Sequence, residues 1–220
     1  MEKYLSPTYY IESDHPAVIE FANKHTKSDE KEIKRAIQLY YAVRDGIRYN
    51  PYSMEPYKES MKASAVLKRK DGYCVAKAVL LAACARSQKI PARLGFADVK
   101  NHLTTKRLMR LMGTDVYIYH GYTEMFLNNK WVKATPAFNL TLCTNFNVKP
   151  LEFDGTKDSI FHPFDKSGNK HMEYVKDHGT FSDLPWEAIM AASKKSYPVY
   201  FEDLERRTKD FSAEALKENL

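Results

Sequence analysis

The sequence predicts an α+β fold, in which N-terminal helices and one buried central helix pack on an antiparallel β-sheet. Three observations predict it. Apolar residues recur at helical spacing in residues 28–46, residues 75–86 are apolar nearly all round, and residues 92–135 contain strand-like runs separated by turn residues. The 220 residues are 44% hydrophobic and 28% charged, which is typical of one globular domain with a sizeable core.

Helical signals dominate the first part of the chain. Residues 13–16 are a cap followed by proline, which is a typical helix start. Ser28 opens a longer helix, Gly46 ends it, and one of its faces is apolar: Ile33, Ala36, Ile37, Tyr40 and Val43. Residues 47–52 look extended, and residues 64–70 allow one or two helical turns.

The central helix starts at Cys74 and should lie buried, because nearly every side of it is apolar. Beyond Pro91 the pattern changes to strands, at residues 92–99, 116–127 and 131–135. Two asparagines, Asn128 and Asn129, separate the last two runs. Because asparagine tolerates positive φ, they predict a two-residue hairpin turn that pairs Leu127 with Lys130.

Charge and cysteine usage exclude several classes of protein. There are 34 basic and 28 acidic residues, a net charge of +6, but the two signs are interspersed, so we expect no nucleic-acid partner. No apolar run is long enough to cross a bilayer, and no signal peptide is evident, so we expect no membrane partner. Three cysteines without a Cys-x-x-Cys pair predict neither a disulfide framework nor a zinc ribbon, but a reducing, cytoplasmic protein.

Cys74 is the first candidate for chemistry. The turn Asp71-Gly72-Tyr73-Cys74 delivers a thiol to the first turn of the apolar helix. A helix N-terminus carries partial positive charge and unpaired N–H groups, and both favour the thiolate. A cysteine there is more often a small buried hydrophobe than a nucleophile, so the functional interpretation requires a base elsewhere in the chain.

His120 is the candidate base, because it lies in the middle of the predicted strand 116–127, where its ring is well oriented. A third residue usually orients such a histidine. With Asn128 and Asn129 as the turn, His120 lies opposite Ala137 and Thr135 lies on its face, diagonal to it. Diagonal neighbours lie roughly 7–8 Å apart, so the two side chains can meet.

Four blocks of residues carry a family resemblance: DGYC at 71–74 with the helix after it, IPAR at 90–93, HGYTE at 120–124 and WVKATP at 131–136. In their order and spacing they resemble the transglutaminase-like superfamily, over about residues 40–138. The resemblance implies a papain-like fold and a Cys-His-Asp triad that transfers acyl groups from amides through a thioester. It makes Cys74 the nucleophile and His120 the general base and acid.

One position departs from the family pattern. The family aspartate is expected just before the proline, where this chain has Thr135. A threonine hydroxyl accepts a hydrogen bond from a ring N–H but carries no charge, so either Thr135 or another residue orients His120. Asn139 lies near in sequence, and Asp98 and Asp115 are less well placed. The Cys74 N–H is the expected first oxyanion donor, with a second from residues 49–57.

Two expectations follow for the organisation of the chain and for its function. We expect residues 1–150 to form the catalytic core and residues 151–220 an extension packed on it, within the same domain, near the cleft. The expected enzyme is a cysteine hydrolase, peptidase or deamidase rather than a protein cross-linker, acting on a peptide, protein or small amide. One alternative is an enzyme that transfers the acyl group to a small amine. The other is a catalytically inactive relative that binds a peptide or protein partner in the former substrate cleft.

The remaining cysteines and histidines have simpler interpretations. We expect Cys84 in the core, Cys143 partly buried and inert, and His102 in a structural hydrogen bond. The other histidines lack the spacing of metal ligands, so we expect no metal and no other cofactor. The aspartates of the extension are better explained as turn residues than as calcium ligands. The histidines and aspartates in question are His162, His171, His178, Asp154, Asp158 and Asp165.

Overall fold

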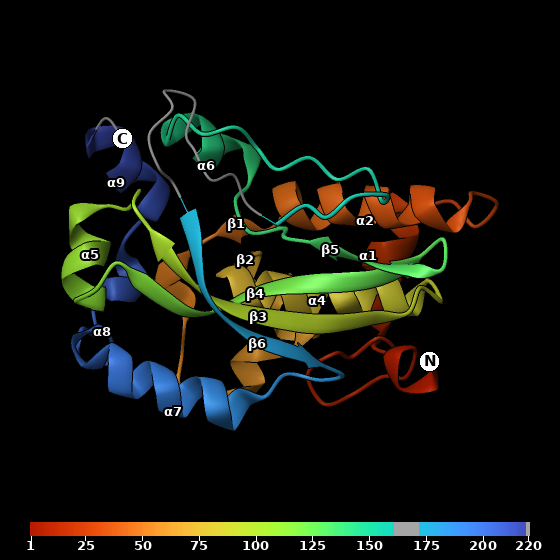
Figure 1. Cartoon of the computed structure of the whole chain (residues 1–220), viewed down its shortest axis with the longest axis horizontal. Coiled ribbons are helices and arrows are strands. Elements are labelled where there is room, and N and C mark those ends of the chain that lie inside the picture. The colour runs from red at the N-terminus through yellow and green to blue at the C-terminus, as the bar shows by residue number, and fades with distance from the viewer. Residues whose placement is uncertain (161–171, 219–220) are drawn as a thin grey trace.

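A four-stranded antiparallel sheet forms the centre of the computed structural model, which describes residues 1–160 and 172–218 (Figure 1). The strands follow the spatial order β5-β4-β3-β6 and are β3 (Ala92–Asn101), β4 (Val116–Leu127), β5 (Lys130–Ala134) and β6 (Met172–Phe181). The three predicted strands are present within a few residues of their expected ends. The fourth, β6, was not predicted, because its mostly exposed residues lack the alternation of a half-buried strand.

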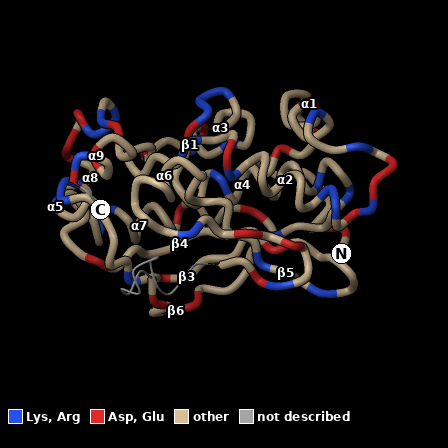
Figure 2. The backbone as a smooth tube through the Cα atoms, turned by 90° about the horizontal axis from the view of Figure 1, so that it is seen from above, with Lys and Arg blue, Asp and Glu red and all other residues tan. Residues whose placement is uncertain are grey.

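Four helices lie on one side of this sheet (Figure 2): α1 (Pro16–His25), α2 (Glu32–Gly46), α3 (Ala63–Arg69) and α4 (Cys74–Ser87). α4 packs directly on β3 and β4, and the other three helices surround it. Every residue of α4 from Cys74 to Arg86 is buried, as its all-round apolar sequence predicts. The predicted α+β class, with a central helix on an antiparallel sheet, is confirmed.

Two N-terminal elements differ from the prediction. α2 begins at Glu32 rather than Ser28, because the N–H of Glu30 donates to the Lys27 carbonyl and closes a turn first. The extended segment is shorter than expected. Only β1 (Arg48–Tyr49) is a strand, paired in parallel with β2 (Asp71–Gly72), and a 3-10 turn starts at the following proline. Proline fixes φ and lacks an N–H, so it favours the turn.

Five further helices complete the described fold: α5 (Lys106–Met112), α6 (Leu140–Asn145), α7 (Trp186–Ser196), α8 (Pro198–Glu202) and α9 (Phe211–Glu218). α5 lies in the connection between β3 and β4, and α5, α8 and α9 gather at one end of the molecule (Figure 1). The division of the chain at residue 150 remains a prediction. Within the described residues, no helix combines the length and the apolar character needed to cross a membrane.

The hairpin between β4 and β5 has the predicted turn. Asn128 and Asn129 both have positive φ, 48° and 63°, and Leu127 pairs with Lys130. The expected pairing of His120 with Ala137 does not form, because the ladder ends at Thr123 and Ala134. Pro136 cannot donate to a ladder, which explains the early end of β5. The chain pairs instead with a later segment, in which the Ser159 carbonyl accepts from the Thr135 N–H.

Lys77 is a fully buried basic residue in the mostly apolar helix α4. Its Nζ donates to the carbonyls of Arg44 at 2.8 Å and Ile47 at 2.6 Å, at the end of α2. A lysine at a helix C-terminus satisfies carbonyls that have no partner in the helix. Lys77 therefore ties α4 to the segment that leads into β1.

Lys77 predicts a pH dependence of stability. Burial lowers the pKa of its ammonium group to about 7, whereas an unfolded lysine titrates near 10.4. Between pH 7 and 8.5 unfolding therefore takes up a proton, so the free energy of unfolding rises with pH, by about 2 kcal/mol from this residue. Urea unfolding at both pH values should show this rise, and Lys77→Met should flatten it. An equally steep rise in the variant would contradict the assignment.

Candidate active site

Cys74 is the first residue of α4, as predicted, and is 8% exposed. The turn that delivers it passes very close to the helix. A Cβ at Gly72 would lie 2.9 Å from the Cβ of Ala76, so a side chain at residue 72 would push the turn away. Gly72 thus allows the approach that places the thiol at the helix start.

The environment of the Cys74 thiol opposes ionisation. Burial raises its pKa to about 11, against hydrogen bonds from the N–H groups of Gly121, Val75 and Cys74 itself, which lower it. The helix start therefore acts in the predicted direction, and burial of the thiol opposes it. Removal from water disfavours the thiolate by more than these donors favour it. A cation beside the sulfur would offset this cost and favour the thiolate.

β4 crosses the first turn of α4 at Gly121, directly after His120. A Cβ at Gly121 would lie 2.9 Å from the Val75 Cα, which is closer than two carbons normally approach. Only glycine allows this contact between strand and helix. As a result, the buried side chain of His120 lines the same cavity as Cys74.

A β-bulge directly before His120 determines where its ring points. The register of β3 and β4 shifts by one residue between the pair Ala97–His120 and the pair Val99–Tyr117, so β4 carries an extra residue. Tyr119 has a φ of 51°, in the left-handed region that aromatic residues rarely adopt. Bulges re-aim side chains beside active sites. The sequence did not predict this bulge, because strand-like alternation continues through it.

The cavity that contains Cys74 and His120 is small and mostly apolar. It encloses about 50 Å³. Among the residues that the structure describes, no side chain that lines it carries a permanent charge. Most of the lining comes from α4, β4, α5, α7, and β1 with the segment after it. The residues of α7, Ile189 and Ser193, show that the C-terminal part of the chain closes one wall of the cavity.

Two tyrosines of this cavity are candidate oxyanion donors. Tyr49 lies in the segment where a second donor was expected, and Tyr73, which the prediction missed, precedes the thiol. Burial and the neighbouring Cys74 charge raise the pKa of both hydroxyls well above 10, so both keep their protons. The Tyr73 hydroxyl is buried and has no hydrogen-bond partner in the described part of the chain. A protonated hydroxyl there can donate to a developing oxyanion.

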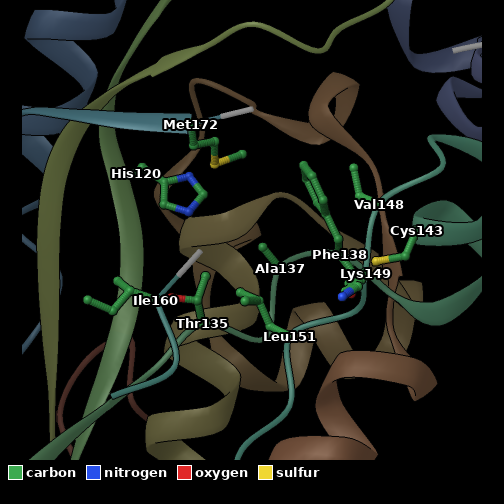
Figure 3. Close-up of a pocket in the computed structure, with 10 residues that line it drawn as sticks. All are labelled: His120, Thr135, Ala137, Phe138, Cys143, Val148, Lys149, Leu151, Ile160 and Met172. Atoms are coloured by element: carbon green, nitrogen blue, oxygen red, sulfur yellow. Dashed lines mark hydrogen bonds between the residues drawn. The ribbon is translucent and has the colours of Figure 1, made fainter. Parts of the chain in front are cut away.

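His120 also lines a second cavity, of about 30 Å³. Figure 3 shows Thr135 below the imidazole, with Met172 above it and Phe138 farther along the cavity. The Thr135 hydroxyl is buried and has no hydrogen-bond partner within residues 1–160 and 172–218. The structure therefore brings Thr135 and His120 to one cavity, although the ladder predicted to align them is absent.

The other candidates for the third residue have different partners. Oδ1 of Asn139 accepts from the N–H of Tyr49 at 3.0 Å and so supports β1. Asp115 forms an ion pair with Lys100 at 3.1 Å. Asp98 follows Ala97, the residue that pairs with His120 on β3, but its Oδ1 accepts from the Tyr119 N–H at 2.9 Å. Of the four candidates, Thr135 is the one that lines a cavity with His120.

Three of the quoted blocks contribute a residue with a structural role. Arg93 pairs with Glu124 across β3 and β4, with 2.6 Å between the guanidinium and the carboxylate. The same guanidinium lies over the ring of Trp131 on β5, 4.1 Å from its centroid. These contacts hold three strands together. They explain why an arginine, a glutamate and a tryptophan occupy these positions.

The remaining predictions have mixed outcomes. Cys84 lies in the core, and burial raises the pKa of its thiol far above the usual value. Cys143 is fully buried rather than partly buried, and it lines the Thr135 cavity because α6 packs inward there. His102 forms the expected hydrogen bond, with Glu173 at 2.6 Å.

The predictions about metal ligands and turn residues concern the extension. Three of these residues, His162, Asp165 and His171, lie outside the described residues. Asp154 closes a turn, since its carboxylate accepts from Thr156 and Lys157. Among the described residues, no three His, Cys, Asp or Glu side chains gather as they would around a metal ion.

Comparisons with known proteins give one family and one fold. The sequence model of the transglutaminase-like superfamily matches residues 19–136. A crystal structure from Cytophaga hutchinsonii, provisionally described as a cysteine protease, is similar with a TM-score of 0.52 and 18% identity. The match covers 86% of this chain and 48% of the other, so this chain spans about half of that protein. A search of curated proteins finds no match to this chain.

Proposed function

Because this chain belongs to the transglutaminase-like superfamily, whose model matches more than half of it, we propose that it is a cysteine-dependent acyl-transfer enzyme. Its substrate would be an amide or peptide bond, cleaved through a thioester. The observation that carries the proposal is the shared cavity of Cys74 and His120, where the Gly121 N–H donates to the thiol. Nucleophile and base in contact with one space are what this chemistry requires.

The first half of the reaction follows from these positions. His120 takes the Cys74 proton, and Sγ attacks the carbonyl carbon of the amide. The imidazolium supplies the cation that the buried thiolate needs. The carbonyl oxygen becomes an oxyanion, which the Cys74 N–H and a tyrosine hydroxyl, from Tyr73 or Tyr49, stabilise. When the oxyanion collapses, the C–N bond breaks and His120 returns the proton to the leaving amine.

The second half decides the type of enzyme. Water or an amine attacks the thioester, His120 takes a proton from the attacking group, and Sγ leaves and is protonated again. We propose hydrolysis or deamidation rather than protein cross-linking, because a cross-linker must keep water away from its thioester. Transfer to a small amine is the related alternative.

A catalytically silent binding protein is the second candidate, and two observations favour it. Thr135 occupies the position of the family aspartate, and it carries no charge to stabilise an imidazolium. Burial also raises the pKa of the Cys74 thiol to about 11. A protein of this kind would bind a peptide in the cavity without reaction.

Alkylation of Cys74 separates the two candidates. At pH 6, we expect iodoacetamide to modify Cys74 more than about tenfold faster in the native protein than in His120→Ala, because the ion pair keeps sulfur as thiolate at low pH. Mass spectrometry of the Cys74 peptide measures the rate. His102→Ala, a surface histidine, is the matched control and should leave it unchanged. Equal rates in native protein and His120→Ala would exclude the enzyme.

Thr135→Asp tests the third residue. A carboxylate in the Thr135 cavity can accept from the ring N–H of His120 and stabilise the imidazolium. We therefore expect a folded protein whose Cys74 alkylation at pH 6 is equal to or faster than that of the native protein. Thr144→Asp adds the same charge on the surface of α6 and should change nothing. Slower alkylation with an intact circular dichroism spectrum would show that Thr135 does not orient His120.

A further inference from the structure

Two bulges face each other across β3, and both lie at the level of His120. On β4 the extra residue lies directly before His120. On β6 the register with β3 shifts between the pair Phe96–Gly179 and the pair Ala97–Asp177, so His178 is an extra residue that pairs with no β3 residue in the ladder. β-Bulges are specific features of a fold rather than defects, and the contacts of the bulged residues indicate their role.

The two bulged residues meet through Asp98. Oδ1 of Asp98 accepts from the Tyr119 N–H at 2.9 Å and lies 2.6 Å from Nε2 of His178. The rings of Tyr119 and His178 stack, with centroids 4.0 Å apart and planes 14° from parallel. The Asp98 and His178 side chains are both only 13% exposed. One carboxylate and one ring stack thus join three strands at this point.

These contacts oppose the strain at Tyr119. A bulky residue with positive φ is strained, and it persists only where its surroundings hold it. The hydrogen bond to Asp98 fixes the Tyr119 peptide, and the stack on His178 fixes its ring. Because the next residue is His120, the direction of the proposed catalytic ring depends on this conformation.

We propose that Asp98 and His178 are positioning residues, which hold the bulge at Tyr119 and thereby aim His120 at Cys74. The inference rests on the proposed function of that pair. His178 lies on β6, outside the residues that match the family model, so the C-terminal part of the chain takes part in the site. Neither residue contacts the reacting atoms. They act through the backbone of β4.

Alkylation of Cys74 at pH 6 tests this inference. We expect Asp98→Ala and His178→Ala to lower the rate by about tenfold, because a displacement of about 1 Å has effects of this order or larger. Asp98→Asn keeps an oxygen where Oδ1 lies, so it should restore most of the rate. Val175→Ala is the matched control, since Val175 also lies at a bulge of β6 but is 57% exposed. It should leave the rate unchanged.

The outcomes distinguish this inference from the proposed function. If the native rate does not depend on His120, the proposed function fails. If it depends on His120 but stays within about twofold in folded Asp98→Ala and His178→Ala, only the positioning role is overturned. Should Asp98→Ala not fold, His178→Phe decides, because it keeps the ring stack and loses only the hydrogen bond. A native rate in His178→Phe and His178→Ala would then overturn the proposal.

Discussion

Replacement of Gly121 by alanine should abolish the reactivity of Cys74 while much of the fold survives. The new Cβ would lie 2.9 Å from the Val75 Cα, and carbons in contact lie about 3.5–4.0 Å apart. β4 and the first turn of α4 must therefore separate by roughly 1 Å, because backbone cannot rotate away as a side chain can. This separation also removes the N–H of Gly121 from Sγ.

We expect alkylation of Cys74 at pH 6 to fall by about a hundredfold in Gly121→Ala, and the free energy of unfolding to fall by about 1–3 kcal/mol. Gly46→Ala is the matched control, because nothing lies within 4 Å of a Cβ at that position. It should retain the native rate and stability. A native rate in Gly121→Ala would mean that the contact between β4 and α4 does not determine the site geometry.

Replacement of Arg86 by methionine should give one of the largest losses of stability in the chain. Arg86 is buried at the C-terminal end of α4 and donates to the carbonyls of Ser6, Ala92 and Ser182. It thereby joins the N-terminal segment, the start of β3 and the segment after β6. Methionine fills similar volume but donates to none of these oxygens.

The balance of effects at Arg86 favours a net loss. Each buried carbonyl without a donor costs about 1–3 kcal/mol. Removal of a buried charge offsets part of this cost, since burial lowers the pKa of the guanidinium to about 10. We expect a net loss of about 2–3 kcal/mol in urea unfolding. Arg35→Met is the control, because Arg35 lies partly exposed on α2, and it should cost less than about 1 kcal/mol. Equal losses would show that these carbonyls are hydrated.

Much of the fold follows from local patterns. The apolar helix after Cys74 is buried as predicted, because an all-apolar surface has no face to offer to water. The turn at Asn128 and Asn129 has the predicted geometry, because only a few residue types accept positive φ in two successive positions. The predicted start of α2 at Ser28 was wrong, because a turn at residues 27–30 forms in place of the first helical turn.

The candidate site could be predicted only in part. The residue types and order of the four blocks identify Cys74 and His120, and the structure places both at one cavity. Tyr73 was missed as a donor, because a tyrosine before a helix has many ordinary roles. Lys77 was missed because one lysine in an apolar helix gives no sign of which carbonyls it will meet.

The local sequence was enough to locate the thiol at a helix start, to identify the strand that carries the histidine and to recognise the family that the chain resembles. These features depend on neighbours within a few residues. The direction of the pKa shift at Cys74, the bulge before His120 and the contacts from that bulge to His178 became visible only in the folded chain. Burial and pairing across a sheet depend on residues far apart in the chain, and local spacing does not encode them.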